Sequence, residues 1–256
     1  MTWDPQRYLN FAGPRLRPAL DLLAQIRLDE ANTIVDLGCG PGNITPYLRQ
    51  RWPKAAITGV DASREMLETA RQTDLAVTWV EANAATWKPA GPVDLIYANA
   101  SLHWLADHEQ LLPRLLAQLA PGGVLAIQMP RNFARPSHQL AALAAREAGV
   151  FEQLQHLFRP PPTHEPAVYY DILAPHCAAL DIWETDYLQP LTGVNPVAEW
   201  TGGSWLRPFA AALDGADRAK FVQTYQDLVA SAYPPRPNGR TLLPYLRLFI
   251  VATPTK

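Results

Sequence analysis

The chain has 256 residues, of which 48% are hydrophobic and 18% are charged, and its formal net charge is -2. This composition is typical of a globular protein with one elaborate domain, or with a core domain and a large insertion. The small net charge provides no field that would attract nucleic acid or an anionic membrane. The polar N-terminus is unlike a signal peptide, and no run of about 18 apolar residues predicts a membrane span, so we expect a cytoplasmic protein.

Two cysteines, Cys39 and Cys177, are far apart in the chain and belong to no metal-ligand spacing. The sequence therefore predicts neither a disulfide nor a metal site. The 25 prolines cluster at segment boundaries, such as residues 159–162 and 233–237, and are typical of rigid turns there.

The first half of the chain alternates helices and strands. Apolar residues recur at helical spacing over residues 14–26, and the apolar run at 33–37 predicts the first strand. Further strands are predicted at 56–60, 77–81, 94–99 and 124–129, with helices over 44–51, 63–70 and 109–119, the second of these capped by Ser63. Such alternation favours a parallel sheet covered by helices on both faces.

After Met129 this rhythm changes. Two helical stretches, 136–157 and 196–231, flank a strand at 180–188, and a last strand is predicted at 247–252. We predict an α/β, Rossmann-like sheet of seven mostly parallel strands, with helical cap insertions after strand 5 and between strands 6 and 7. The expected organisation is a core with an N-terminal cover helix (1–130), a cap insertion (131–179), a core strand (180–190), a second insertion (191–240) and a final core strand (241–256).

Three alternate glycines, Gly38, Gly40 and Gly42, follow the first predicted strand. Glycine lets the backbone turn tightly and approach a ligand, and the next helix offers unpaired N–H groups. The G-x-G-x-G spacing differs from the G-x-G-x-x-G of dinucleotide binders. Asp61 ends the second predicted strand, where a carboxylate can accept both hydroxyls of a ribose. A purely structural turn, and a helix cap at Asp61, are the alternatives.

Residues 36–42, Asp61 and the segment Glu81-Ala82-Asn83-Ala84 together resemble class I S-adenosylmethionine-dependent methyltransferases. The resemblance covers about residues 30–130. It implies that the turn beginning at Asp36 faces the methionine part of S-adenosylmethionine, that Asp61 binds the ribose, and that Asn83 and the Ala84 backbone bind the adenine. Many family members carry Asp where Asn83 stands, and an amide can donate or accept in that place.

The fourth predicted strand ends at Asn99 and runs into Ala100-Ser101-Leu102-His103-Trp104, similar to the family's segment beside the sulfonium. Backbone carbonyls and an aromatic ring at this point would favour a cationic sulfur. The resemblance therefore implies that Asn99 and Trp104 belong to the cofactor site. A core anchor is the alternative for Trp104, and a packed or surface histidine is the alternative for His103.

The ends of the chain extend the resemblance over nearly the whole sequence, to family members that methylate a small tricarboxylate. The segments that carry it are residues 3–9, 99–104, 171–173, 181–183, 206–209 and 247–252. It implies transfer of a methyl group to one carboxylate, giving a monomethyl ester and S-adenosylhomocysteine. The alternatives are another small carboxylate or a malonyl thioester as acceptor, a nucleotide-dependent oxidoreductase, and a non-catalytic binding module.

A tricarboxylate needs cationic partners, and the arginine fork matches a carboxylate. We select Arg207, in an apolar stretch, and Arg247, at the start of the last strand, followed by Tyr8 and Arg17 because an N-terminal helix commonly covers the cofactor in this family. Each arginine has a solvated surface role as its alternative. His103 is given an orienting role, since a carboxylate is ionised at pH 7 and needs no general base. Nothing in the sequence demands more than a monomer.

Overall fold

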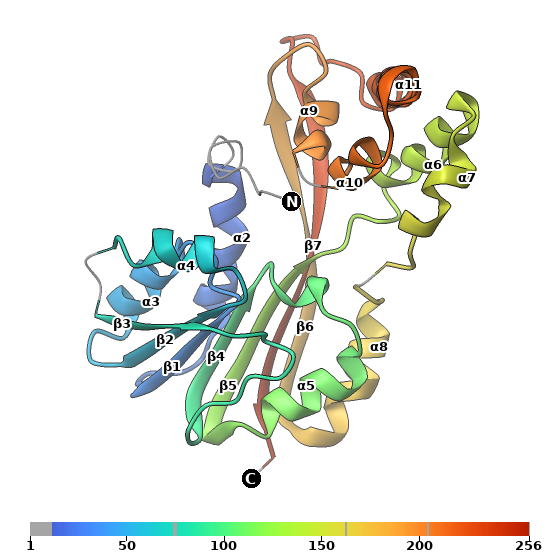
Figure 1. Cartoon of the computed structure of the whole chain (residues 1–256). Helices are drawn as coiled ribbons and strands as arrows, with labels where there is room; N and C mark the ends of the chain where they lie inside the picture. The colour runs from blue at the N-terminus through green and yellow to red at the C-terminus, as the bar shows by residue number, and fades with distance from the viewer. Residues whose placement is uncertain (1–11, 74–75, 162, 204, 256) are drawn as a thin grey trace. The chain divides into compact units, whose positions relative to one another are not determined.

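The computed structural model describes residues 12–73, 76–161, 163–203 and 205–255 (Figure 1). The chain divides into two compact units. The α/β unit comprises Gly13–Pro130, Pro162–Thr185 and Arg247–Lys256, and the helical unit is built mainly from Arg131–Pro161 and Asp186–Leu246. Residues 163–179, which we expected in the first cap insertion, thus lie in the α/β unit.

A seven-stranded sheet has the strand order β3-β2-β1-β4-β5-β7-β6. Its strands are β1 (Thr33–Leu37), β2 (Ala56–Asp61), β3 (Val77–Glu81), β4 (Val93–Asn99), β5 (Leu119–Pro130), β6 (Cys177–Leu191) and β7 (Thr241–Pro254). The pairs among β1 to β5 are parallel, and β7 runs antiparallel to β5. This arrangement confirms the predicted mostly parallel sheet of seven strands.

Three strands extend well beyond the residues that their sequence pattern indicated. The Pro121-Gly122-Gly123 group, which follows the helix predicted over 109–119, lies inside β5, where the pairing with β4 shifts register and Gly122 has a φ of 79°. A glycine inside a strand commonly marks such an irregularity. Strands β6 and β7 likewise extend beyond the expected 180–188 and 247–252.

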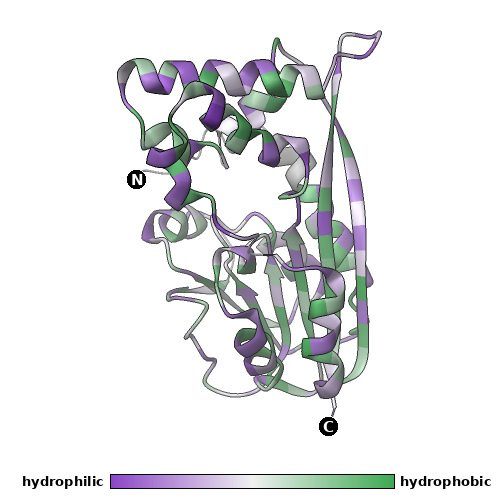
Figure 2. Cartoon of the chain, turned by 90° about the vertical axis from the view of Figure 1, so that its right-hand side faces the viewer, coloured by the Kyte–Doolittle hydropathy of each residue, from purple (hydrophilic) through white to green (hydrophobic). Residues whose placement is uncertain are grey.

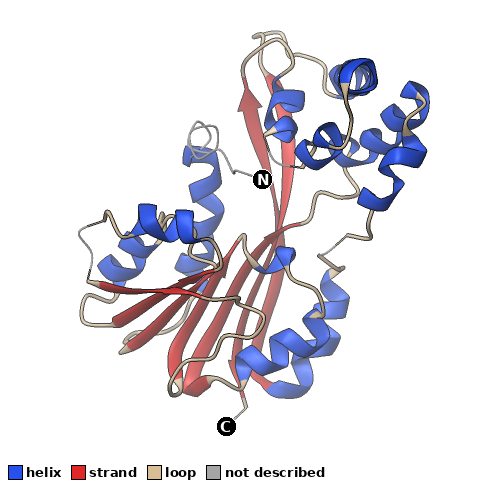
Figure 3. Ribbon diagram, viewed as in Figure 1, coloured by secondary structure: helices blue, strands red, loops and turns tan. Residues whose placement is uncertain are grey.

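Helices cover both faces of the sheet in the α/β unit (Figure 3). They are α2 (Ala12–Gln25), α3 (Thr45–Arg51), α4 (Arg64–Ala70), α5 (His108–Leu116) and α8 (Pro166–Leu173). On one face, Leu112 of α5 and Leu173 of α8 are buried in the core with the strands, while on the other the Tyr97 hydroxyl donates to the Ala19 carbonyl of α2. Ser63 caps α4 as predicted, because its hydroxyl accepts from the Met66 N–H.

The helical unit contains α6 (Pro136–Ala148), α7 (Phe151–Leu154), α9 (Pro196–Gly202), α10 (Arg207–Ala211) and α11 (Gly215–Ala232). Polar and apolar residues interleave along α11 (Figure 2), and its buried residues Phe221, Tyr225 and Val229 are four apart, on one helix face. The Tyr225 hydroxyl donates to the Ser137 carbonyl of α6 at 2.7 Å. Over the part of the chain that is described, no helix is long and apolar enough to cross a membrane.

Candidate active site

The glycine turn connects β1 to α3, and Gly38, Gly40 and Gly42 have φ angles of 73°, 55° and 79°. Residues with a Cβ rarely adopt such angles. A Cβ on Gly38 would lie 2.2 Å from the Ser101 Cβ, whereas a Cβ on Gly40 would have no described atom within 4 Å. Packing therefore requires a glycine at 38, while the space beside Gly40 is open to a ligand.

The carboxylate of Asp61 holds this turn in place. Its Oδ2 atom accepts a hydrogen bond of 2.8 Å from the Gly40 N–H, and Oδ1 accepts one of 2.8 Å from the Ser63 N–H. Asp61 therefore has a structural role, which the sequence analysis gave as an alternative: it holds the glycine turn and the residue that precedes α4. A carboxylate has about four acceptor positions, and this one is only half-buried. Acceptor capacity thus remains for the hydroxyls of a ribose.

Asp36 lies behind the turn. The side chain is buried, and its Oδ2 atom accepts a 2.7 Å hydrogen bond from the Thr45 hydroxyl at the start of α3. Burial raises the pKa of this carboxyl to about 7, the Thr45 hydrogen bond lowers it, and the nearby Asp61 charge raises it again. The position suits a residue that ties β1 to α3, and the contact with the cofactor that we expected of Asp36 stays a prediction.

The segment expected to bind adenine is an ordered loop after β3. The Asn83 side chain is exposed, and its Oδ1 atom accepts from the Ala85 N–H at 2.9 Å, as in an Asx turn. Arg114 of α5 donates to the carbonyls of Ala84 and Trp87, each at 3.0 Å. Our sequence reasoning missed Arg114, a basic residue in the last turn of α5 that no motif singles out.

The loop after β4 carries His103 and Trp104 on the short helix η1 (Leu102–Trp104). It begins at Ala100, which has a φ of 50°, a strained angle that is commonest at functional sites. Trp104 is 77% exposed and so is not a core anchor. His103 is 9% exposed, and burial, with the charge of Arg247 and the neighbouring His108, lowers its pKa to about 3. Its imidazole is therefore neutral at pH 7 and is not a surface group.

Polar side chains from β4, β5 and β7 lie on one face of the sheet, near the ends of β4 and β5. Asn99 pairs with Gln128, and Gln128 with Phe249, so their side chains share a face, and Arg247 shares it because it is two residues from Phe249. The Arg247 Nη1 atom lies 3.4 Å from the Gln128 Oε1 atom, to which it donates. The buried polar atoms of this region that have no hydrogen-bond partner among the described residues include Asn99 Oδ1, His103 Nδ1 and Gln128 Nε2.

Open α/β sheets bind ligands at the carboxyl ends of their parallel strands. The unpartnered atoms lie at this edge, beside the glycine turn at the end of β1. Buried polar groups are normally hydrogen-bonded, so these atoms indicate a site for a polar ligand. Gln128 was absent from our predicted site, although it is a polar residue inside the apolar run of a predicted strand.

The remaining predicted residues are less constrained. Arg17 of α2 has an exposed side chain 3.8 Å from Asp21, and Arg207 is half-buried at the start of α10 in the helical unit. Tyr8 lies outside the described residues. Because Arg207 and Arg247 belong to different units, a shared carboxylate site for both arginines stays a prediction.

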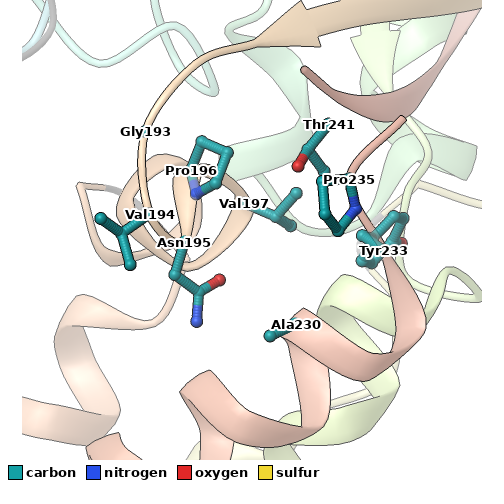
Figure 4. A pocket seen from close by; sticks show the side chains of 9 residues that line it. All are labelled: Gly193, Val194, Asn195, Pro196, Val197, Ala230, Tyr233, Pro235 and Thr241. Carbon is teal, nitrogen blue, oxygen red and sulfur yellow. The ribbon is translucent and has the colours of Figure 1, made fainter. Parts of the chain in front are cut away.

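A cavity of about 140 Å³ in the helical unit contains none of the predicted site residues (Figure 4). It lies between the start of α9 and the end of α11, and Asn195 in its wall donates to the Gln226 carbonyl. None of the residues that we name at the polar sheet edge lines this cavity. The described residues also contain no group of three His, Cys, Asp or Glu side chains that could hold a metal ion.

Comparison with known proteins identifies the family. A family profile described as a methyltransferase domain matches residues 8–164. Trans-aconitate 2-methyltransferase of Azoarcus sp. (strain BH72) is 50% identical over 256 residues, with 98% of each chain covered. The chain belongs to the family of trans-aconitate 2-methyltransferases. The Klebsiella pneumoniae (strain 342) member of this family is 47% identical over 250 residues, which cover 98% of this chain and 97% of that one.

The fold is that of solved methyltransferases. Phosphoethanolamine N-methyltransferase 2 of Haemonchus contortus, in complex with phosphomonomethylethanolamine and S-adenosylhomocysteine, has a TM-score of 0.56 at 14% identity, covering 93% of this chain and 53% of that chain. As a member of its family, this protein is an S-adenosylmethionine-dependent methyltransferase that acts on a small molecule. The predicted fold, enzyme class and cofactor are confirmed, and the oxidoreductase and non-catalytic alternatives are excluded.

Proposed function

We propose that the protein transfers the methyl group of S-adenosylmethionine to one carboxylate of trans-aconitate, giving the monomethyl ester and S-adenosylhomocysteine. The observation that carries this proposal is the polar sheet edge, where buried donors and acceptors with no partner among the described residues lie near the Arg247 guanidinium. Such a site suits a small polyanion. The relatives that share about half of their residues with this chain along nearly its whole length carry the same activity in their names.

The cofactor half of the site fits S-adenosylmethionine. The open space beside Gly40 accommodates its methionine part, the free acceptor positions of Asp61 suit its ribose hydroxyls, and the loop at Asn83 suits its adenine. When bound, the cofactor supplies a methyl group activated by a cationic sulfur. The unpartnered Asn99 Oδ1 atom is an acceptor, which favours positive charge at this edge.

The acceptor half of the site works by binding and orientation. A carboxylate is already ionised at pH 7, so no residue has to remove a proton from it. The neutral His103 does not supply a cationic clamp, but its ring can orient the acceptor through one hydrogen bond. The Arg247 guanidinium neutralises a carboxylate, and we assign the same role to Arg207 of the helical unit. Such positioning can supply up to about 7–11 kcal/mol in ideal cases.

Further parts of the proposal come from the sequence. We place Tyr8 and Arg17 at the acceptor, in keeping with the family resemblance. The near-neutral charge favours an enzyme without nucleic-acid or membrane partners. We retain a cytoplasmic monomer as the expected state, to be checked by fractionation and by light scattering.

The proposed function is tested by direct assay. The enzyme is incubated with methyl-labelled S-adenosylmethionine and, separately, with trans-aconitate, cis-aconitate and a malonyl thioester. Mass spectrometry follows S-adenosylhomocysteine and the ester, and NMR identifies the methylated carboxylate. We expect the highest kcat/KM with trans-aconitate. Equal or faster turnover of the malonyl thioester would contradict the proposal.

A further inference from the structure

Gln128 lies in the middle of the polar sheet edge. Its side chain is 0% exposed, in β5 between Asn99 of β4 and Phe249 of β7. The Oε1 atom accepts from Nη1 of Arg247 at 3.4 Å. A guanidinium only donates hydrogen bonds, so the oxygen of the amide must face it, and the orientation of the amide group is fixed. The Nε2 donor therefore turns away from Arg247.

The Nε2 group has no acceptor among the residues that the structure describes. A buried N–H without an acceptor costs free energy and is rare in folded proteins. Asn99, the residue paired with Gln128 on the next strand, has an Oδ1 atom that likewise has no partner among the described residues. Because both groups lie at the ligand-binding edge of the sheet, a ligand is the natural source of the missing partner.

We propose that the Gln128 amide binds one carboxylate of the acceptor that does not react, beside the guanidinium of Arg247. This inference rests on the proposed function. A carboxylate accepts several hydrogen bonds, so it satisfies the Nε2 donor and the adjacent guanidinium at once. Donors on the attacking oxygen would compete with the methyl group for its lone pairs, which is why the amide is assigned to a carboxylate that does not react.

The contact makes Gln128 a specificity residue. An acceptor without this carboxylate leaves the buried amide unpaired, and sites built to hydrogen-bond a substrate group discriminate strongly against analogues that lack it. Gln128 thereby distinguishes a tricarboxylate from smaller carboxylates that Arg247 alone would also attract.

The first test replaces Gln128 by methionine, which has a similar volume but no N–H. We expect the KM for trans-aconitate to rise about ten- to hundredfold, the loss of a hydrogen bond to a charged group, with unchanged affinity for S-adenosylhomocysteine by calorimetry. Gln118→Met is the matched control. The Gln118 amide is also buried without partners among the described residues, but Gln118 precedes β5, at the opposite end of that strand. It should alter stability without altering the KM.

A second variant and three analogues guard against a purely structural effect. Gln128→Glu keeps the size of the side chain, can pair with Arg247, and should weaken acceptor binding further by repulsion. Mesaconate, itaconate and (Z)-glutaconate each lack a different carboxylate of trans-aconitate. Calorimetry on the S-adenosylhomocysteine complex measures the Kd of each analogue for Gln128→Met and for the wild type. The two proteins should bind only one analogue equally well, the one that lacks the carboxylate that Gln128 binds.

If the wild type methylates trans-aconitate, the inference about Gln128 would still be overturned by an unchanged KM in Gln128→Met. The same ratio of the Gln128→Met Kd to the wild-type Kd for all three analogues would also overturn it. A KM change shared by Gln118→Met has the same consequence. A wild-type enzyme that neither binds nor methylates trans-aconitate would instead overturn the proposed function, and the inference with it.

Discussion

The Asp61 carboxylate accepts a 2.8 Å hydrogen bond from the N–H of Gly40, so the residue at the end of β2 shapes the turn that follows β1. Its other oxygen accepts from Ser63 at the start of α4. One side chain thus fixes two segments of the cofactor site and keeps acceptor positions for a ligand.

Replacing Asp61 by asparagine should weaken cofactor binding about ten- to hundredfold. The amide keeps one acceptor atom but places an NH₂ donor where the carboxylate accepted, so either a backbone N–H or a ribose hydroxyl loses its partner, and the charge is lost as well. Calorimetric titration with S-adenosylhomocysteine measures the effect. Glu68→Gln, an exposed charge removal on α4, is the control. Wild-type affinity in Asp61→Asn would refute the assigned role.

Alanine at Gly38 and at Gly40 should have different effects. At position 38 the new Cβ would clash with the Ser101 Cβ, so the melting temperature should drop, and a second change, Ser101→Gly, should restore part of it. At position 40 no described atom is near, so stability should fall only by the strain of a positive φ, about 1–2 kcal/mol. Cofactor affinity should still fall, since the methyl group fills the ligand space. Equal melting temperatures for the two variants would contradict this distinction.

Stability should depend on pH through Asp36. Its pKa lies at about 7 in the fold against 3.8 ordinarily, mainly because the carboxyl is buried. The folded state thus holds a proton that the unfolded state releases, and stability falls as pH rises from about 4 to 7, then levels off. Asp36→Asn removes this effect. Relative to wild type it should be neutral at pH 4 and more stable at pH 8, by up to about 4 kcal/mol.

Urea denaturation of both proteins across this range measures the difference. The comparison cancels the contributions of all other titrating groups. A stability difference that does not change with pH would show that Asp36 does not carry the proton.

His103 should contribute to acceptor binding without setting the pH dependence of the reaction. Burial, with Arg247 and His108 nearby, lowers its pKa to about 3, so its charge does not change between pH 5.5 and 8. His103→Asn should raise the KM for trans-aconitate and leave the shape of the kcat/KM profile unchanged. His156→Asn, an exposed histidine of the helical unit, is the control. Loss of kcat at every pH with unchanged acceptor affinity would disprove the positional role.

Local sequence patterns predicted most of the sheet. The strand at 33–37 and the strand at 77–81 were predicted at their observed bounds. Short apolar runs that end at turn residues can be recognised from the local sequence alone. Helix α8 was missed within a proline-rich stretch, although Pro166 occupies its first turn, where proline is tolerated. The extent of β5 was misjudged because glycines that usually end an element form an irregularity inside it.

The sequence predicted the site residues that belong to a motif, but not those whose role depends on tertiary contacts. The glycine turn and Asp61 are recognisable by spacing. Gln128 and Arg114 are not recognisable in this way. Gln128 matters because its buried amide has no partner among the described residues. Arg114 matters because it donates to two carbonyls of a loop about thirty residues away in the sequence.

The pair of hydrogen bonds from Arg114 ties an irregular loop to helix α5. Ordering a loop when a ligand binds reduces affinity, because conformational freedom is lost in the complex. Here α5 removes that freedom beforehand through the carbonyls of Ala84 and Trp87. Contacts to the adenine can then contribute to affinity without an offsetting entropic penalty from this segment.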